Sequence, residues 1–454
     1  MLLINSRNKF YSSSCFLIIL AENYCMRKPL LIILILFVAF KSNSQSLSEK
    51  EKQIIQYINA HLNETQNMLI ETVNINSGTL NKEGVKKVGA IFSRELEKAG
   101  LHSEWVPLPD SLNRAGHLVA IRNGKKGKKI FIIGHLDTVF EPDMPANPWK
   151  MLNDSTATGQ GANDMKGGDV IAIAALQALQ SMHLLDDATV VVYFTGDEER
   201  AGIPTSISRK DFIERAKQCD VALGFEGAQG LHSVATARRG SSNWKLSVTA
   251  NTFHSSGVFK SGYGAIYESA RILNEFREQL STEKYLTFNP GLIVGGSDVN
   301  YDESKAIGNV IGKSNIVSPS CYVSGDLRFL TEEQKEAARK KMKEIVAHHL
   351  KGTNAEIKFS DGIPAMEPTE GNNKILKILD KTTRDMGIGE SIAGDPGGRG
   401  AGDISYVAKY VDCLDGLGAS GNGAHAPGET INLKEFPYLI QRAAILMFRL
   451  INTE

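Results

Sequence analysis

The stretch Lys129–Val139 reads Lys-Ile-Phe-Ile-Ile-Gly-His-Leu-Asp-Thr-Val, and the rest of the fold is organised around it. Its apolar, β-branched run from Ile130 to Ile133 predicts a strand buried on both faces, as central strands of parallel sheets are. His135 and Asp137 come directly after this run. Because positions i and i+2 of an extended chain point the same way, both side chains should emerge together at the carboxyl end of the strand, where open α/β sheets bind ligands. One such pair is more often structural than functional, so its meaning depends on the residues at the ends of the other strands.

Composition and charge narrow the class of protein. The 454 residues are enough for two or three domains, and 42% hydrophobic with 22% charged residues is typical of a globular protein. The formal net charge is +0 and no long run of one sign occurs, which argues against a nucleic-acid partner. After the first 44 residues the cysteines are widely spaced, which indicates buried thiols and not a disulfide framework; they are Cys219, Cys321 and Cys413.

The first 44 residues have the pattern of a leader. Met26-Arg27-Lys28 is basic, the run from Pro29 to Phe40 is continuously apolar, and a polar segment with small residues continues up to Ser44. This order predicts a secretory signal peptide that starts at Met26 and is cleaved after Ser44. The apolar run is shorter than the about 20 residues that a transmembrane helix needs. The alternative to a cleaved signal peptide is an uncleaved membrane anchor. We therefore expect a secreted or periplasmic protein with no stable membrane anchor after cleavage.

Residues outside the central stretch predict further elements of an α/β fold. Ser48 and Glu51 form a capping-box pattern at the start of an amphipathic helix. A strand-like segment covers residues 118–122, and we interpret the basic stretch 123–129 as a solvated hairpin loop between it and the central strand. Near the end of the chain, a glycine-rich loop precedes a helix that we predict over residues 404–410.

Two motifs place carboxylates next to predicted strands or helices. Asp164 stands in the glycine-rich stretch Gly161–Gly168 just before a helix, where it is either a helix N-cap or a ligand for cations. The buried strand predicted over Ala188–Gly196 ends in the three consecutive acids of Asp197–Glu199. Three acids at a strand end repel one another unless a cation lies among them, and a solvated acidic loop is the alternative.

Two single residues complete the set of possible ligands. Glu226 comes after a short apolar run, and His425 lies in a loop rich in glycine and proline near the end of the chain. Seen alone, a loop histidine is more often a surface residue than a ligand. Together, however, these sites supply two imidazoles and three or more carboxylates, a set that suits a pair of Zn²⁺ ions or a related metal such as Co²⁺ or Mn²⁺. Such cations polarise a carbonyl and generate hydroxide near neutral pH.

The order and spacing of five motifs resemble the M20 metallopeptidase family, most closely its glutamate carboxypeptidase-like branch. The motifs are Gly-His135-Leu-Asp137-Thr-Val, Asn-Asp164-Met-Lys-Gly-Gly, Asp-Glu198-Glu199, Phe-Glu226 and Gly-Ala-His425. The resemblance extends from about Glu49 to the end of the chain. It implies that His135 and Glu226 bind one zinc, that Glu199 and His425 bind the other, and that Asp164 bridges them. It also implies that Glu198 is the general base and acid and that Asp137 orients His135.

The same resemblance assigns residues 236–352 to an inserted lid that also forms a dimer interface. Their predicted order of strands and helices suits an antiparallel sheet covered by one layer of helices. By the resemblance, His254 completes the partner subunit's site and steadies the oxyanion, and Asn315 and Arg328 help to bind the substrate carboxylate, with a surface ion pair as the alternative for Arg328. Arg399, in the glycine-rich loop, is a further residue able to meet a carboxylate.

We therefore predict an α/β protein with a di-zinc catalytic domain of the aminopeptidase/carboxypeptidase type and an inserted α+β lid (dimerisation) domain. The leader covers residues 1–44, the catalytic domain residues 46–235 and 353–454, and the lid residues 236–352. One departure from the family pattern concerns Ile363, which stands where glutamate carboxypeptidase-like members commonly carry arginine. This departure argues against a strict preference for a terminal glutamate.

The implied reaction is zinc-dependent hydrolysis of a peptide bond next to a free C-terminal carboxylate, through a hydroxide that bridges the two metals. A homodimer that forms through the lid is the expected assembly. An N-acyl amino acid deacylase of the same family is the first alternative, because it shares every catalytic residue. A metal-binding protein without turnover is the second, and Glu198 argues against it, since a binding module needs no general base.

Overall fold

A computed structural model describes residues 47–302 and 307–453 of the chain. The predicted leader, with its signal peptide and cleavage site, lies outside the described residues. Within them, no helix is both long and apolar enough to cross a membrane. The three cysteines of this range, Cys219, Cys321 and Cys413, are buried and free, as their spacing predicts.

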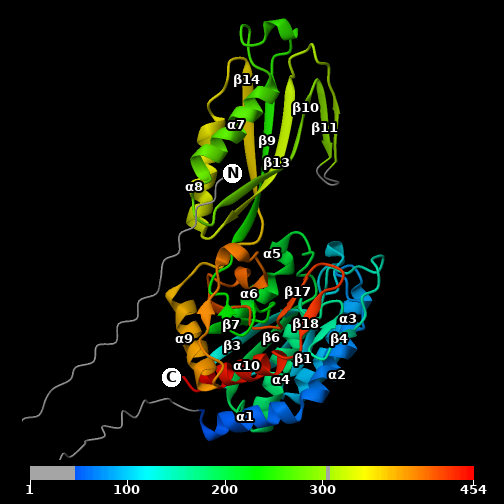
Figure 1. Ribbon diagram of the computed structural model, residues 1–454, viewed down its shortest axis with the longest axis vertical. Coiled ribbons are helices and arrows are strands. Elements are labelled where there is room, and N and C mark those ends of the chain that lie inside the picture. Colours follow the sequence, from blue (N-terminus) through cyan, green and yellow to red (C-terminus); the bar gives the residue numbers. More distant parts are fainter. Residues whose placement is uncertain (1–46, 303–306, 454) are drawn as a thin grey trace, which may run out of the picture. The chain divides into compact units, whose positions relative to one another are not determined.

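The larger sheet is built from six strands. They are β1 His102–Val106, β2 His117–Arg122, β3 Lys126–His135, β6 Ala188–Thr195, β7 Val221–Gly224 and β16 Asp412–Leu414. In space they lie in the order β1-β2-β6-β3-β7-β16, and Figure 1 labels β1, β6, β3 and β7 of this sheet. β6, β3, β7 and β16 run parallel to one another, whereas β1 and β2 are antiparallel to their neighbours. A mainly parallel sheet with helices on its faces is the α/β architecture that the sequence predicts.

Strand β3 is buried on both faces, as its apolar run predicts. Ile130 and Ile132 pack into one hydrophobic cluster, while Phe131 and Ile133 pack into a second cluster. Alternate residues of a strand face opposite sides of the sheet, so burial of all four side chains requires cover on both faces. β3 is therefore the strand around which both clusters form.

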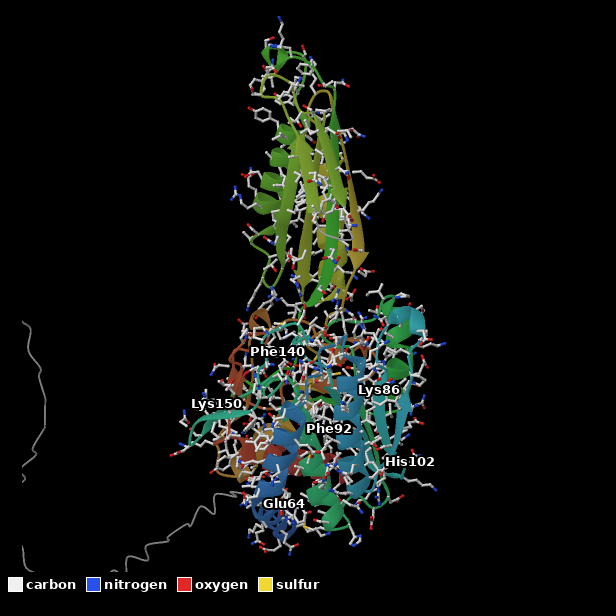
Figure 2. All side chains as sticks on the ribbon, turned by 90° about the vertical axis from the view of Figure 1, so that its right-hand side faces the viewer. Glu64, Lys86, Phe92, His102, Phe140 and Lys150 are labelled. Carbon is white, nitrogen blue, oxygen red and sulfur yellow. The ribbon has the colours of Figure 1, made fainter. Side chains whose placement is uncertain are left out.

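Helices cover the six-stranded sheet. They are α1 Glu49–Ala60, α2 Leu62–Val73, α3 Lys82–Lys98, α4 Lys166–Ser181, α5 Thr205–Ser208, α6 Lys210–Ala216, α9 Glu370–Asp385 and α10 Phe436–Ile451. α4 packs against α1, α2, α3 and α10 and is buried along most of its length, which explains why apolar residues dominate its sequence. α3 is amphipathic, with Lys86 exposed and Phe92 in the core (Figure 2). Ser48 and Glu51 form the predicted capping box before α1.

A small sheet joins segments that are far apart in sequence. Its strands are β4 Lys150–Asn153, β5 Thr156–Thr158, β17 Gly421–Asn422 and β18 Thr430–Asn432, in the order β17-β18-β5-β4. Because β18 pairs with β5, the segment after β5 that carries Asp164 lies beside the β17–β18 loop that carries His425. A separate parallel pair consists of β8 Ser233–Val234 and β15 Ile392–Ala393.

The remaining strands and helices form an α+β unit with its own core. β9 Gly240–Ala250, β10 Thr287–Gly296, β13 Ser320–Phe329 and β14 Thr353–Asp361 form an antiparallel sheet in the order β10-β13-β9-β14. α7 Ala265–Leu280 and α8 Glu332–Val346 lie on one face of it (Figure 1) and share a hydrophobic cluster with Trp244. β11 Asp298–Asp302 and β12 Ile307–Ile311 form an antiparallel pair that contacts β10. A sheet with one layer of helices is the arrangement predicted for this segment.

Three expectations about local structure differ from the structure. β14 begins at residue 353, where the sequence-based boundary resumes the catalytic domain, yet β14 pairs with β9 of the α+β unit. Residues 123–129 do not form a hairpin loop, because β6 lies between β2 and β3 and pairs with both. The helix predicted over residues 404–410 is reduced to the 3₁₀ turn Asp403–Tyr406. In each case, pairing or packing between segments distant in sequence overrides the local pattern.

Candidate metal centre

The carboxyl ends of three neighbouring parallel strands meet at one edge of the six-stranded sheet. β3 ends at His135, β6 leads into Glu198 and Glu199, and β7 leads into Glu226. Because β3 lies between β6 and β7, these side chains leave the sheet next to one another. Buried strands that end in an imidazole and in acids therefore form one side of the candidate site.

Asp164 lies between the two histidines of the site. Its Oδ1 atom is 3.2 Å from His135 Nε2, and its Oδ2 atom is 3.0 Å from His425 Nε2. Asp164 does not cap α4, because the residue before this helix is Met165 and no side-chain hydrogen bond caps its first turn. Of the two interpretations that the sequence left open, the geometry favours a carboxylate shared between two ligand sets.

Each histidine also approaches a glutamate. His425 Nε2 is 3.2 Å from Glu199 Oε2, and His135 Nε2 is 3.7 Å from Glu226 Oε1. The result is two half-sites, His135 with Glu226 and His425 with Glu199, which share Asp164. Ligand atoms of His135, Asp164 and Glu199 lie within 4.8 Å of one another. The structure thus brings together all five side chains that the sequence proposes as metal ligands.

The electrostatics of this cluster fit divalent cations. Burial and the Asp164 carboxylate raise the pKa of Glu226 to about 7, and burial raises the pKa of Glu199 to about 8. A hydrogen bond to Asp164 raises the pKa of His425 to about 9. Glu199 Oε1 is buried without a hydrogen-bond partner. Imidazole nitrogen and carboxylate oxygen atoms are suitable ligands for zinc and related metals, whose charge would offset the burial of these acids.

Cation affinity is expected to rise with pH from about 6 to about 9 and then to level off, because the ligands must lose their protons to bind a metal. The raised pKa values of Glu226, Glu199 and His425 place these protons in that range. A falling pH protonates the ligands and so releases the cation. Titration with Zn²⁺ against a competing chelator at several pH values measures the effect. An affinity that does not change over this range contradicts the assignment of these ligands.

Asp137 supports two parts of the site. His135 Nδ1 lies 3.0 Å from the backbone carbonyl oxygen of Asp137, which leaves Nε2 free to face the cluster. The Asp137 carboxylate accepts hydrogen bonds from Thr79 Oγ1 and from the backbone N–H groups of Glu198 and Glu199, at 2.6, 3.0 and 3.2 Å. Asp137 Oδ1 is farther from His135 Nδ1, at 3.6 Å. The backbone carbonyl group of Asp137 therefore contacts His135 most closely, whereas the Asp137 carboxylate positions the acidic loop Asp197–Glu199. The sequence did not predict this second role of Asp137.

A buried ion-pair network behind Glu198 was also missed by sequence reasoning. Arg209, between α5 and α6, pairs with the carboxylates of Asp197 and Asp403. The second oxygen of Asp403 accepts a hydrogen bond from Thr195 Oγ1 at the end of β6. The network ties the start of the acidic loop to the glycine-rich loop before Asp403. No local pattern marks Arg209, because a lone arginine beside two short helices resembles a surface residue.

Three residues that the sequence assigns to the substrate side lie in the α+β unit. His254 is exposed, and its Nδ1 is 2.9 Å from Ser256 Oγ. Asn315 is exposed too. Arg328 forms an ion pair with Asp326 on the same strand, the alternative considered for it. Within the described residues these side-chain contacts of His254 and Arg328 are local, so the roles proposed for the three residues stay predictions.

Arg399 adjoins the segment just after Glu226. Its Nη1 donates to the Gly227 carbonyl oxygen at 3.2 Å, whereas its Nε and Nη2 are buried without a hydrogen-bond partner. Burial and the neighbouring Arg238, which pairs with Asp415, lower the pKa of Arg399. A buried guanidinium with unused donors is suited to bind an anion such as a carboxylate.

Comparison with known proteins identifies the family. The sequence profile of peptidase family M20/M25/M40 matches residues 131–449, a span that includes all five candidate ligands. The chain belongs to this peptidase family. It is therefore a hydrolase, and the M20 resemblance of its motifs is confirmed.

A relative of this M20 protein points to one branch of the family. Carboxypeptidase G2 from Pseudomonas sp. (strain RS-16) is 26% identical over 429 residues, which covers 92% of this chain and 97% of the relative. The predicted similarity to the glutamate carboxypeptidase-like branch is thereby confirmed. M20 metallopeptidases use divalent metals, and the His135 cluster is compatible with one.

Solved structures agree with the predicted fold class. The aminopeptidase PepT from Bacillus cereus ATCC 10987 aligns with a TM-score of 0.70 at 16% identity, covering 85% of this chain and 98% of PepT. The YXEP protein of Bacillus subtilis, a dinuclear metal-binding peptidase from the M20 family, aligns with a TM-score of 0.62 at 14% identity, covering 87% and 100%. At these identities the likeness concerns the fold.

Proposed function

We propose that this M20 hydrolase uses two Zn²⁺ ions to cleave an amide bond next to a free C-terminal carboxylate, as a carboxypeptidase does. The observation that carries this proposal is the Asp164 carboxylate between His135 and His425, each of which approaches its own glutamate. One shared carboxylate with two imidazoles and two further acids is a donor set for a pair of metals. The relationship to carboxypeptidase G2 supports the reaction type.

We assign the proton transfers to Glu198, which is not one of the five proposed metal ligands. Zinc, when bound, would polarise the substrate carbonyl and lower the pKa of water. Burial and the carboxylates of Glu226, Asp403 and Glu199 raise the pKa of Glu198 well above its ordinary value. A carboxylate with a raised pKa accepts a proton from the attacking water and then donates it to the leaving amine nitrogen. Asp137 holds the backbone of Glu198 in place for both transfers.

The unused donors of Arg399 support a substrate with a free carboxylate. Its Nε and Nη2 atoms are buried and unpaired, and it lies on the Glu226 side of the cluster. An anion from the substrate would satisfy both donors at once. Because Ile363 replaces the arginine common in glutamate carboxypeptidase-like members, we propose a C-terminal residue other than an obligatory glutamate.

Zinc-loaded protein is expected to release the C-terminal amino acid from dipeptides, and a chelator is expected to abolish this release. The same peptides amidated at the C-terminus serve as the matched control. The amidated peptides lack the negative charge that Arg399 would bind. Their kcat/KM should therefore be about 10–100-fold lower than that of the free dipeptides, which is the usual contribution of a hydrogen bond to a charged group.

The substrate panel also includes N-acyl amino acids, which test the rival assignment. Cleavage of these compounds alone would favour an N-acyl amino acid deacylase of the same family. No cleavage of either class by protein that holds two zinc ions would contradict the proposed hydrolysis and favour a binding protein without turnover. The presence of Glu198 argues against that last assignment, because a binding protein needs no general base.

We also propose that the protein acts outside the cytoplasm, secreted or periplasmic, and as a homodimer. The basic and apolar pattern of residues 26–40 supports the first point. The resemblance of residues 236–352 to the lid of M20 enzymes supports the second. Sedimentation of the purified protein would measure its oligomeric state directly.

A further inference from the structure

Glu429 is a buried acid in the loop that carries His425. It is the last residue before β18 and lies four positions after His425, and its side chain is fully buried. Glu429 is not among the predicted site residues. An acid is rarely buried completely unless hydrogen bonds or an opposite charge compensate it, so the partners of Glu429 show what it does.

The partners of the Glu429 carboxylate are backbone N–H groups of the loop that carries Asp164. Oε1 accepts hydrogen bonds from the N–H groups of Asn163 and Asp164 at 2.6 and 2.8 Å, and Oε2 accepts one from Gly161 at 3.1 Å. Charge-assisted hydrogen bonds of this kind are stronger than neutral ones. The side chain of one ligand loop thus fixes the backbone of the other.

The backbone of Glu429 strengthens the same connection. Its carbonyl oxygen accepts hydrogen bonds from Thr158 Oγ1 at 2.6 Å and from the Gly159 N–H at 3.2 Å. Thr158 is the last residue of β5, and Gly159 begins the segment that leads from β5 to Asp164. Glu429 therefore joins the two loops through five hydrogen bonds, three to its carboxylate and two to its carbonyl oxygen.

The His425 loop is held at its ends by the β17–β18 pair, and within it the Ala426 N–H donates to Gly423 and the Glu429 N–H to Ala426, both at 3.1 Å. His425 has a positive φ of 66°, and Gly423 and Gly428 on either side also have positive φ. The imidazole of His425 is 58% exposed, so packing does not hold it against Asp164. A flexible, exposed ligand loses affinity because binding must order it, and preorganisation removes that loss.

We propose that Glu429 is a positioning residue that makes the Asp164 loop and the His425 loop one unit, so that the two cations of the centre bind as a pair. This inference depends on the proposed two-metal function. If the loops move together, His135, Glu226 and Asp164 would become ordered when they hold one cation, and Glu429 would then position His425 for a second. If they move separately, the ion at His425 and Glu199 binds independently and more weakly.

The test is the Glu429→Gln variant, titrated with Zn²⁺ against a competing chelator at fixed pH. Glutamine keeps the size of the side chain, but its amide group presents a donor to the N–H groups of the Asp164 loop. We expect the affinity for one of the two zinc ions to fall by about 10–100-fold, the usual effect of losing a group that supports a ligand. The wild type should bind two ions in one step, and the variant in two separate steps.

Glu268→Gln is the matched control. Glu268 is also fully buried and accepts the Leu350 N–H at 3.0 Å, but it lies on α7 of the α+β unit. Its substitution should leave both zinc affinities unchanged. Equal losses in the two variants would overturn the inference, because they would show a general effect of removing a buried carboxylate.

The remaining outcomes distinguish a failure of this inference from a failure of the proposed two-metal function. A wild type that fails to bind two zinc ions would overturn the proposed function itself. A wild type that binds two, with Glu429→Gln binding identically, would overturn only the role of Glu429. If Glu429→Gln does not fold, Glu429→Asp keeps the charge but shortens the reach, and the same separation of the two binding steps is expected.

Discussion

Replacing Glu198 by glutamine is expected to lower kcat by about 10²–10⁴-fold, the range over which a positioned general base contributes to a rate. The amide has nearly the shape of the carboxylate, so Asp137 still accepts the backbone N–H of residue 198. The substitution removes the group that accepts and returns a proton. Zinc binding should persist, because His135, Asp164, Glu199, Glu226 and His425 are untouched.

Two measurements check this expectation together: steady-state turnover of a dipeptide, and the number of zinc ions per chain after dialysis. Glu64→Gln, on the exposed face of α2, is the matched control and should behave as the wild type does. Retained turnover in Glu198→Gln would rule out Glu198 as the base. A variant that loses both turnover and zinc would show that Glu198 acts on metal binding.

Asp164→Asn is expected to abolish tight binding of both cations and, with it, activity. Each oxygen of Asp164 faces a different histidine, at 3.2 and 3.0 Å. An amide offers one neutral oxygen in place of two that share a negative charge, so neither half-site keeps its shared ligand. The loss of affinity should exceed the about 10–100-fold that results from removal of an outer supporting group.

The measurement is zinc content and affinity by chelator competition. Asp154→Asn is the control, because Asp154 is exposed between β4 and β5, the strand that leads to Asp164. Unchanged affinity in Asp164→Asn would contradict the shared-ligand assignment. Loss of only one zinc ion would mean that Asp164 serves a single half-site.

Much of the candidate site is predictable because buried strands leave a clear pattern. The second half of β3 contains an apolar run, Ile130–Ile133, because burial on both faces excludes polar side chains there until the strand ends at His135. β6 has the same character and leads into Glu198 and Glu199. Charged residues that directly follow such a run lie at the carboxyl end of the strand. The local sequence therefore predicts at which edge of the sheet the candidate metal ligands lie.

Errors arose where pairing joins distant segments. β14 has alternating half-buried and exposed residues at the edge of its sheet, so its sequence does not show which sheet it joins. The insertion of β6 between β2 and β3 cannot be read from the short connection 123–129, because a short connection favours a hairpin only if the two strands are neighbours.

The contacts that support the ligands were missed for a related reason. Arg209 and Asp403 are 194 positions apart, and Glu429 and Asp164 are 265 positions apart. A salt bridge or a hydrogen bond over such a separation produces no periodicity, spacing or run of residue types. Arg209 and Glu429, each taken alone, match a common surface or turn residue.

The sequence by itself determined the α/β class, the buried strands and the side chains that could bind a metal. The tertiary structure decided that Asp164 stands between His135 and His425, and that Glu429 joins their loops. The physical reason is that burial constrains each residue type locally, since polar groups are excluded from a packed strand. The partners of a polar side chain depend instead on the order of strands in the sheets, which the pairing of β18 with β5 sets here.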